Sequence, residues 1–147
     1  MKILNLSNNE IQRFSNGLVA NNILLEKLEL QNNKISYIQK FALKNGFHLQ
    51  HLDLSNNQLK TLSADPNNLF SNNNQLKFLN LENNLLVKVS KDVFGSGSLS
   101  GSLEILRLRG NTGKVVGRDK RACFQGTLRQ EKNRSRSFDC SLDIYFH

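Results

Sequence analysis

Residues 49–59 read LQHLDLSNNQL, and this stretch decides the fold of the chain. Leucines occupy its first, fourth, sixth and last positions, and an asparagine occupies the ninth. The same pattern, with Met or Ile at some apolar positions, occurs five times, beginning at Met1, Leu25, Leu49, Leu76 and Leu103. The starts lie 24, 24, 27 and 27 residues apart, and the fifth unit is incomplete. A fixed period of about 20 to 50 residues indicates stacked structural repeats, that is, a solenoid.

Each unit predicts one short strand followed by a turn. Leucines alternate with other residues at its fourth to sixth positions, which is the period of a strand with one buried side. The asparagine follows the strand, where its amide bonds backbone groups that no strand pairing satisfies. The rest of each unit, after the strand and the asparagine, is too short for a long helix, so we expect turns or short 3-10 segments there. We therefore expect an α/β solenoid: a right-handed horseshoe arc with parallel strands on its concave face.

Length and charge divide the chain into a repeat region and a basic tail. The 147 residues correspond to one domain, with repeats over residues 1–111. Residues 1–106 carry ten Lys/Arg against eight Asp/Glu, whereas residues 107–147 carry ten against four. The tail, residues 112–147, is either a solvated segment or a surface for an anionic partner. No stretch of about 18 apolar residues is present, so no membrane span is expected.

The repeats resemble the typical, extracellular class of leucine-rich repeat found in Toll-like receptors and related animal surface proteins. The resemblance rests on the 24-residue unit, on the Ser-Asn-Asn or Gln-Asn-Asn step at residues 7–9, 31–33 and 55–57, and on Phe70 and Phe94 near repeat ends. It implies a receptor-like module, without cofactor, that binds a protein or glycan ligand on its concave face.

The tail resembles the C-terminal cap of this family in part. Such caps often read Phe-x-Cys-x-Cys before an aromatic-rich helix, and Phe138 and Cys140 keep the start of that motif. Cys123 and Cys140 are the only cysteines and predict a disulfide in an oxidising compartment, with two free thiols as the alternative. Asn133 begins an Asn-x-Ser sequon and is a candidate glycosylation site if the protein is secreted.

Residues at the third, fifth and seventh positions of the units form columns on the concave face, because the strands stack in register. From these columns we select the candidate ligand-binding residues Lys27, Glu29, His51, Asp53, Phe78, Asn80, Ile105, Arg107 and Arg109. An aromatic side chain surrounded by polar groups is typical of a binding hot spot, so Phe78 is the first candidate for contact with a ligand. The alternative is that Phe78 packs beside the side-chain stem of Lys77. Arg109 alternatively pairs with Glu82 across the strands.

Other chemistry finds less support in the sequence. Glu29 and Asp53 are expected about 5 Å apart on neighbouring strands. They could form a glycosidase pair, a docking point for a basic group of a ligand, or an ordinary solvated face. An open sheet excludes no water, so we expect no enzyme. His48 and His51 lack further ligands, so no metal is expected. The basic residues between Lys114 and Arg136 lack an interleaved aromatic platform, which disfavours nucleic acid.

Three hypotheses of function remain open. The first is part of an extracellular or cell-surface repeat ectodomain that recognises a ligand. The second is an intracellular repeat adaptor or regulator with reduced cysteines, and the third is a truncated product without independent function. Met1 already occupies the first leucine position, so we expect an uncapped N-terminal edge, either in a fragment or in a protein that self-associates through that edge.

Overall fold

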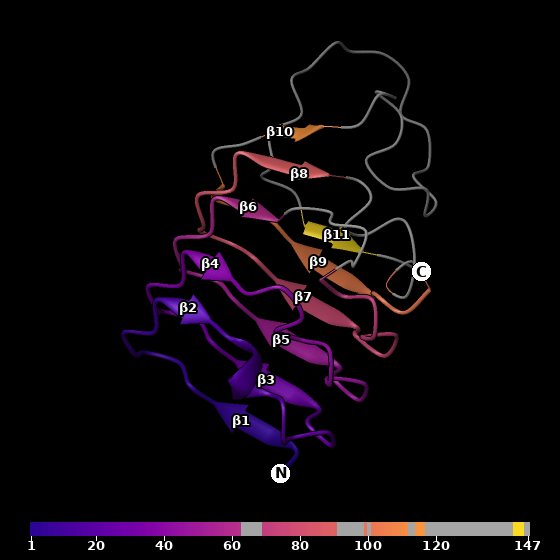
Figure 1. Cartoon of the computed structure of the whole chain (residues 1–147). Helices are drawn as coiled ribbons and strands as arrows, with labels where there is room; N and C mark the ends of the chain where they lie inside the picture. Colours follow the sequence, from indigo (N-terminus) through magenta and orange to yellow (C-terminus); the bar gives the residue numbers. More distant parts are fainter. Residues whose placement is uncertain (63–68, 91–98, 100, 112–113, 117–142, 146–147) are drawn as a thin grey trace.

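The computed structural model describes residues 1–62, 69–90, 99, 101–111, 114–116 and 143–145. Its main feature is a large sheet whose strands follow one another from repeat to repeat (Figure 1). In spatial order the strands are β1 (Ile3–Asn5), β3 (Lys27–Glu29), β5 (His51–Asp53), β7 (Phe78–Asn80), β9 (Ile105–Arg107) and β11 (Asp143–Tyr145). The first five pair in parallel, which confirms the predicted solenoid.

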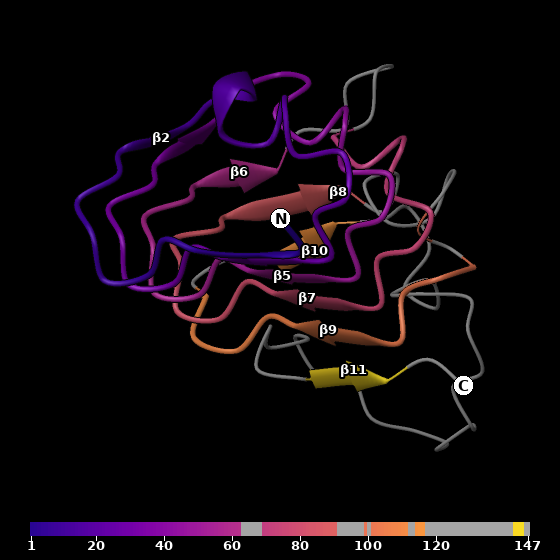
Figure 2. The same ribbon diagram turned by 90° about the horizontal axis from the view of Figure 1, so that it is seen from below.

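A second layer of strands lies across the solenoid from the large sheet (Figure 2). It contains one pair, β2 (Arg13–Phe14) with β4 (Tyr37–Ile38), and one three-stranded sheet of β6 (Thr61–Leu62), β8 (Lys88–Ser90) and β10 (Lys114–Val116). The sequence predicted turns and short helical pieces here, and the described residues include the 3-10 segment η1 (Asn16–Leu18). The strands form because successive repeats are already stacked at strand spacing, so extended residues after each turn also pair.

The hydrophobic core lies between these two layers. The central residues of the large-sheet strands, Leu28, Leu52, Leu79 and Leu106, are all 0 % exposed. Phe14 and Phe70 close the core from the other side, and both are fully buried. In the first repeat Leu4, Leu6 and Ile11 are only partly buried, because a repeat of this chain packs against them from one side alone.

A ladder of buried asparagines holds the turns that follow the large-sheet strands. The Asn57 Nδ2 donates to the carbonyls of Leu30, Leu54 and Ser55 at 3.0–3.1 Å, and its Oδ1 accepts the Ile35 N–H at 2.9 Å. The same arrangement recurs at Asn33, Asn84 and Asn111. Each asparagine thus joins its own turn to the preceding repeat, which confirms the predicted role of the asparagine that recurs at the ninth position of the unit.

A second set of asparagines precedes the buried ladder and adopts left-handed backbone. Asn8, Asn32, Asn56 and Asn83 have φ between 52° and 57°. Asn is, after Gly, the residue that best tolerates this region. In the fifth repeat the equivalent residue is Gly110, with φ 75°. The turn therefore has one backbone shape in every repeat, and the sequence supplies a residue that suits it.

The last described strand departs from the repeat pattern. β11 pairs antiparallel with β9, with Asp143 opposite Arg107 and Tyr145 opposite Ile105. Lying outside the repeats, β11 is not constrained to their chain direction. It covers an edge of β9 that would otherwise leave backbone groups unpaired, as a cap does. The predicted disulfide residues Cys123 and Cys140 and the glycosylation candidate Asn133 lie outside the described residues.

Candidate ligand-binding face

The outward-pointing residues of the large sheet form the predicted columns. His51 is the register partner of Lys27 on one side and of Phe78 on the other, and Phe78 in turn faces Ile105. We call this surface the open face. It consists of Ile3, Lys27, His51, Phe78 and Ile105, of Asn5, Glu29, Asp53, Asn80 and Arg107, and of Ser7, Gln31, Ser55, Glu82 and Arg109.

Three side chains of the open face stack on one another. The ring of Phe78 lies parallel to that of His51, with 4.2 Å between centroids and 6° between planes. The guanidinium carbon of Arg107 lies 5.4 Å from the Phe78 centroid. Because β7 lies between β5 and β9, His51 and Arg107 approach the phenyl ring from opposite sides. Lys77, the alternative packing partner, pairs instead with Glu104 at 3.0 Å.

The basic end of the open face keeps unused hydrogen-bonding capacity. The Nε of Arg107 is buried and has no hydrogen-bond partner, although the residue itself is half-buried. Arg109 is exposed. Within the described part of the chain no ion pair joins Arg109 to Glu82, so the predicted cross-strand pair does not form. Arg107 and Arg109 therefore offer positive charge to a partner.

The two carboxylates at the other end are already engaged. Glu29 pairs with Lys27 at 2.8 Å. Asp53 Oδ1 accepts hydrogen bonds from the backbone N–H and the hydroxyl of Ser55, at 2.9 and 2.6 Å. Its Oδ2 accepts one from Asn80 at 3.2 Å. Because Glu29 has an ion-pair partner and both oxygens of Asp53 accept hydrogen bonds within the protein, these contacts favour an ordinary solvated face over a glycosidase pair or a docking point.

Asn80 departs from the prediction, because its side chain is buried (5 % exposed) and was expected to face solvent or ligand. Asn80 lies between Asp53 of β5 and Arg107 of β9 in the strand register. Its Nδ2 donates to Asp53, and its Oδ1 accepts the Glu82 backbone N–H at 3.0 Å. Asn80 therefore positions Asp53 rather than contacting a ligand.

The environment of His51 favours its neutral form. Burial lowers the pKa of this imidazole below its usual value because the charged form is desolvated, and the ammonium of Lys27 lowers it further. The carboxylates of Asp53 and Glu29 act in the opposite direction with smaller effect. A neutral imidazole stacked on a phenyl ring gives the centre of the open face an uncharged aromatic surface.

The sequence placed Gln31 in a column but did not select it as a candidate. Its Oε1 is buried and lacks a hydrogen-bond partner, which makes it a further polar group of the open face. Its place in the seventh-position column was the only available signal. Among the described residues no group of three or more His, Cys, Asp or Glu is arranged to hold a metal ion. The same residues contain no helix that is both long and apolar enough to cross a membrane.

Part of the repeat region matches the model of a known protein family. Residues 23–86 match the family model described as leucine rich repeat, and this segment covers the second and third units and the first 11 residues of the fourth. No curated protein sequence matches the chain closely enough to count as a relative. The matched segment contains β3, β5 and β7 and the asparagines that join their turns. Together with the stacked parallel strands, the match shows a solenoid fold of the leucine-rich repeat type.

Proposed function

We propose that the chain is a non-enzymatic, receptor-like recognition module that binds a protein ligand on the open face. Leucine-rich repeat domains are suited to protein–protein interaction, because their stacked strands display an extended surface. The observation that carries the proposal is the stack of His51, Phe78 and Arg107, flanked by Ile105 and Arg109. Aromatic and arginine side chains at the centre of a surface are the usual hot spots of binding.

The stack is organised before any ligand arrives. Phe78 is held between two neighbours, so little side-chain freedom remains to be lost on binding, and loss of that freedom is a main cost of association. Among the residues whose side chains the structure describes, none forms an ion pair with Arg107 or Arg109, so both add positive charge to the open face. This combination favours a partner that covers Ile105 with an apolar group and places a carboxylate near the arginines.

We further propose that the chain acts outside the cell, as part of a secreted or cell-surface ectodomain. The support is the resemblance of the repeats to the extracellular class and the confinement of both cysteines to the tail. Native and reduced mass spectrometry tests this. A Cys123–Cys140 disulfide supports the proposal, whereas two free thiols in protein kept under oxidising conditions contradict it and favour an intracellular adaptor.

Differential capture from secreted and cell-surface proteins tests the open face. Three baits are compared: the unchanged chain, the double variant Phe78→Leu/Arg107→Glu, and the matched control Tyr37→Leu/Arg13→Glu on the second layer. Tyr37 and Arg13 are exposed on β4 and β2, so the control makes similar chemical changes away from the open face. Thermal unfolding must first show that all three baits are fully folded at the temperature of the capture.

The proposal predicts proteins that the unchanged chain and the control retain equally and the open-face variant loses. If the control bait loses them as well, or if all three baits retain the same proteins in equal amounts, the open face is not the binding surface.

A further inference from the structure

The end of β1 carries a recognition sequence for N-linked glycosylation, Asn5-Leu6-Ser7. The Asn-x-Ser pattern occurs at one other place in the chain, at Asn133, which lies outside the described residues. In this modification the side-chain nitrogen of the asparagine receives the sugar, so Nδ2 has to be accessible. Whether Asn5 can be modified therefore depends on its side chain and on the strand that carries it.

The side chain of Asn5 is held by its oxygen. Asn5 is exposed, and its Oδ1 accepts hydrogen bonds from the backbone N–H and the hydroxyl of Ser7 at 2.9 and 2.7 Å. Its Nδ2 donates to no group in the described part of the chain. The serine of the recognition sequence thus fixes the amide oxygen, and the nitrogen stays available.

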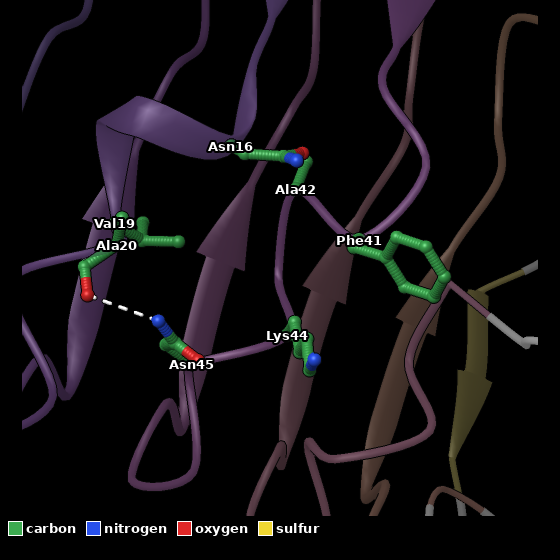
Figure 3. Close-up of a pocket in the computed structure, with 7 residues that line it drawn as sticks. All are labelled: Asn16, Val19, Ala20, Phe41, Ala42, Lys44 and Asn45. Carbon is green, nitrogen blue, oxygen red and sulfur yellow. Dashed lines mark hydrogen bonds between the residues drawn. The ribbon is translucent and has the colours of Figure 1, made fainter.

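Other asparagines use the same nitrogen to hold the fold. The Nδ2 of Asn45 donates to the Ala20 carbonyl at 3.0 Å, from the second repeat to the first (Figure 3). Asn80, which occupies the position of Asn5 in the fourth repeat, is buried and donates to Asp53. A sugar on either nitrogen would break a contact between repeats. A sugar on Asn5 would break none that the described residues make.

The strand that carries Asn5 lies at an edge of the large sheet. β1 pairs with β3 on one side, and no described strand flanks its other side. Lys2 and Leu6 use their backbone groups to bond β3. Because alternate residues face the partner strand, Ile3 and Asn5 present their backbone groups to the open edge. Such an edge is a template for pairing with another chain, and natural proteins protect it.

We propose that Asn5 carries an N-linked glycan that protects the edge of β1. The inference rests on the proposed location of the chain outside the cell. Nδ2 loses one proton and forms a bond to the anomeric carbon of a sugar. At the same time the bond from that carbon to the phosphate of a lipid-linked oligosaccharide diphosphate breaks.

The position of the glycan suits a protective role. A glycan is bulky and hydrated, so on Asn5 it covers the edge beside Met1 and Ile3, which are 63 % and 59 % exposed. It also stands in the way of a strand that would pair with β1. The point of attachment lies three strand spacings from Phe78, about 14 Å, at the opposite end of the open face from Arg107.

Secretion of the full chain from a eukaryotic host, directed by a cleavable signal sequence, tests the site. The signal sequence makes the result independent of the natural location, which the thiol measurement addresses. Peptide mapping of protein from the medium should find a glycan on Asn5 that peptide N-glycosidase removes, converting the asparagine to aspartate. Asn5→Gln and Ser7→Ala should each lose this glycan, whereas Ser7→Thr should keep it.

A positive control shows that the transferase reached the chain. Ile23→Thr creates an Asn-x-Thr sequence at the exposed Asn21 and should add a glycan there. An unmodified Asn5 in protein recovered from the medium, beside a modified Asn21 in the control, overturns the assignment.

Sedimentation over a range of concentrations tests the protective role. The glycosylated chain should stay monomeric, whereas Asn5→Gln should self-associate. Ile3→Lys in the Asn5→Gln background should restore the monomer, because charged edges resist pairing. Ile23→Lys changes the same residue type at similar exposure, 57 %, away from the edge, and should not restore it. An Asn5→Gln chain that stays monomeric, or equal rescue by both lysines, would overturn protection of the β1 edge.

Discussion

The imidazole ring of His51 lies parallel to the phenyl ring of Phe78, with 4.2 Å between their centroids. The two residues occupy the same position of consecutive repeats, and the pairing of β5 with β7 places them opposite each other. Arg107 covers the ring from β9. The proposed recognition surface is thus built by strand register, with one side chain from each of three repeats.

Burial of His51 predicts a stability that depends on pH. Its pKa in the folded chain lies below 6.5, so between that pKa and 6.5 the unfolded chain binds more protons than the folded chain. Stability should therefore fall as the pH drops through this window and change no further, from this group, below the folded pKa. Thermal unfolding at about pH 8 and about pH 5 should show a larger loss for the unchanged chain than for His51→Gln. Equal losses would contradict the stated environment of His51.

Two adjacent asparagines should respond differently to substitution. Asn57→Ala removes four hydrogen bonds to backbone groups in the core and should cost about 2–4 kcal/mol. Asn56→Gly keeps the left-handed backbone, as Gly110 does in the fifth repeat, and should change stability by less than about 0.5 kcal/mol. Urea unfolding of both variants measures the difference. A cost at Asn56→Gly as large as at Asn57→Ala would refute the buried ladder.

Neighbouring residues of β7 should separate folding from binding. Leu79 is fully buried, and Leu79→Ala should destabilise the chain by about 2–5 kcal/mol. Phe78→Leu keeps an apolar side chain on the open face and should cost about 1 kcal/mol, mainly from the lost stacking. Denaturant unfolding compares the two. If Phe78→Leu unfolds the chain as readily as Leu79→Ala, Phe78 belongs to the core and not to a recognition surface.

The backbone of Phe41 predicts an unusual order of stabilities. Phe41→Gly and Phe41→Ala both delete the ring, but only glycine adopts φ 66° without steric penalty. The glycine variant should be more stable than the alanine variant by about 1 kcal/mol, the opposite of the order expected in ordinary extended or helical backbone. Thermal unfolding of the pair checks this. Greater stability of the alanine variant would show that the turn does not hold Phe41 in the left-handed region.

Much of the fold could be predicted from the repeat itself. The spacing of the leucines predicted which residues are buried. The asparagine after each strand predicted which side chain makes hydrogen bonds to the backbone of the turn. Register then placed His51, Phe78 and Ile105 in one column. These features follow from local periodicity, which a single sequence shows directly.

Other features depend on contacts that periodicity does not encode. The burial of Asn80 depends on its neighbours on β5 and β9, and the antiparallel return of β11 depends on a segment outside the repeats. Phe41 has left-handed backbone, and its equivalent in the first repeat is Gly17. Because the two repeats share no residue type at this position, the sequence did not indicate the left-handed turn. The hydrogen bonds of Asp53 with Ser55 could have been predicted from the sequence. Asn5 and Ser7 have the same spacing in the first repeat and make the same hydrogen bonds.

Hydroxyl-radical footprinting of the chain with a captured partner tests the central claim most directly. The account predicts that the partner lowers the oxidation of His51, Phe78 and Ile105 on the open face. Oxidation of Tyr37, which is 56 % exposed on the second layer, should stay unchanged. Protection of Tyr37 with no protection of His51, Phe78 or Ile105 would contradict the account and place the binding surface on the other side of the solenoid.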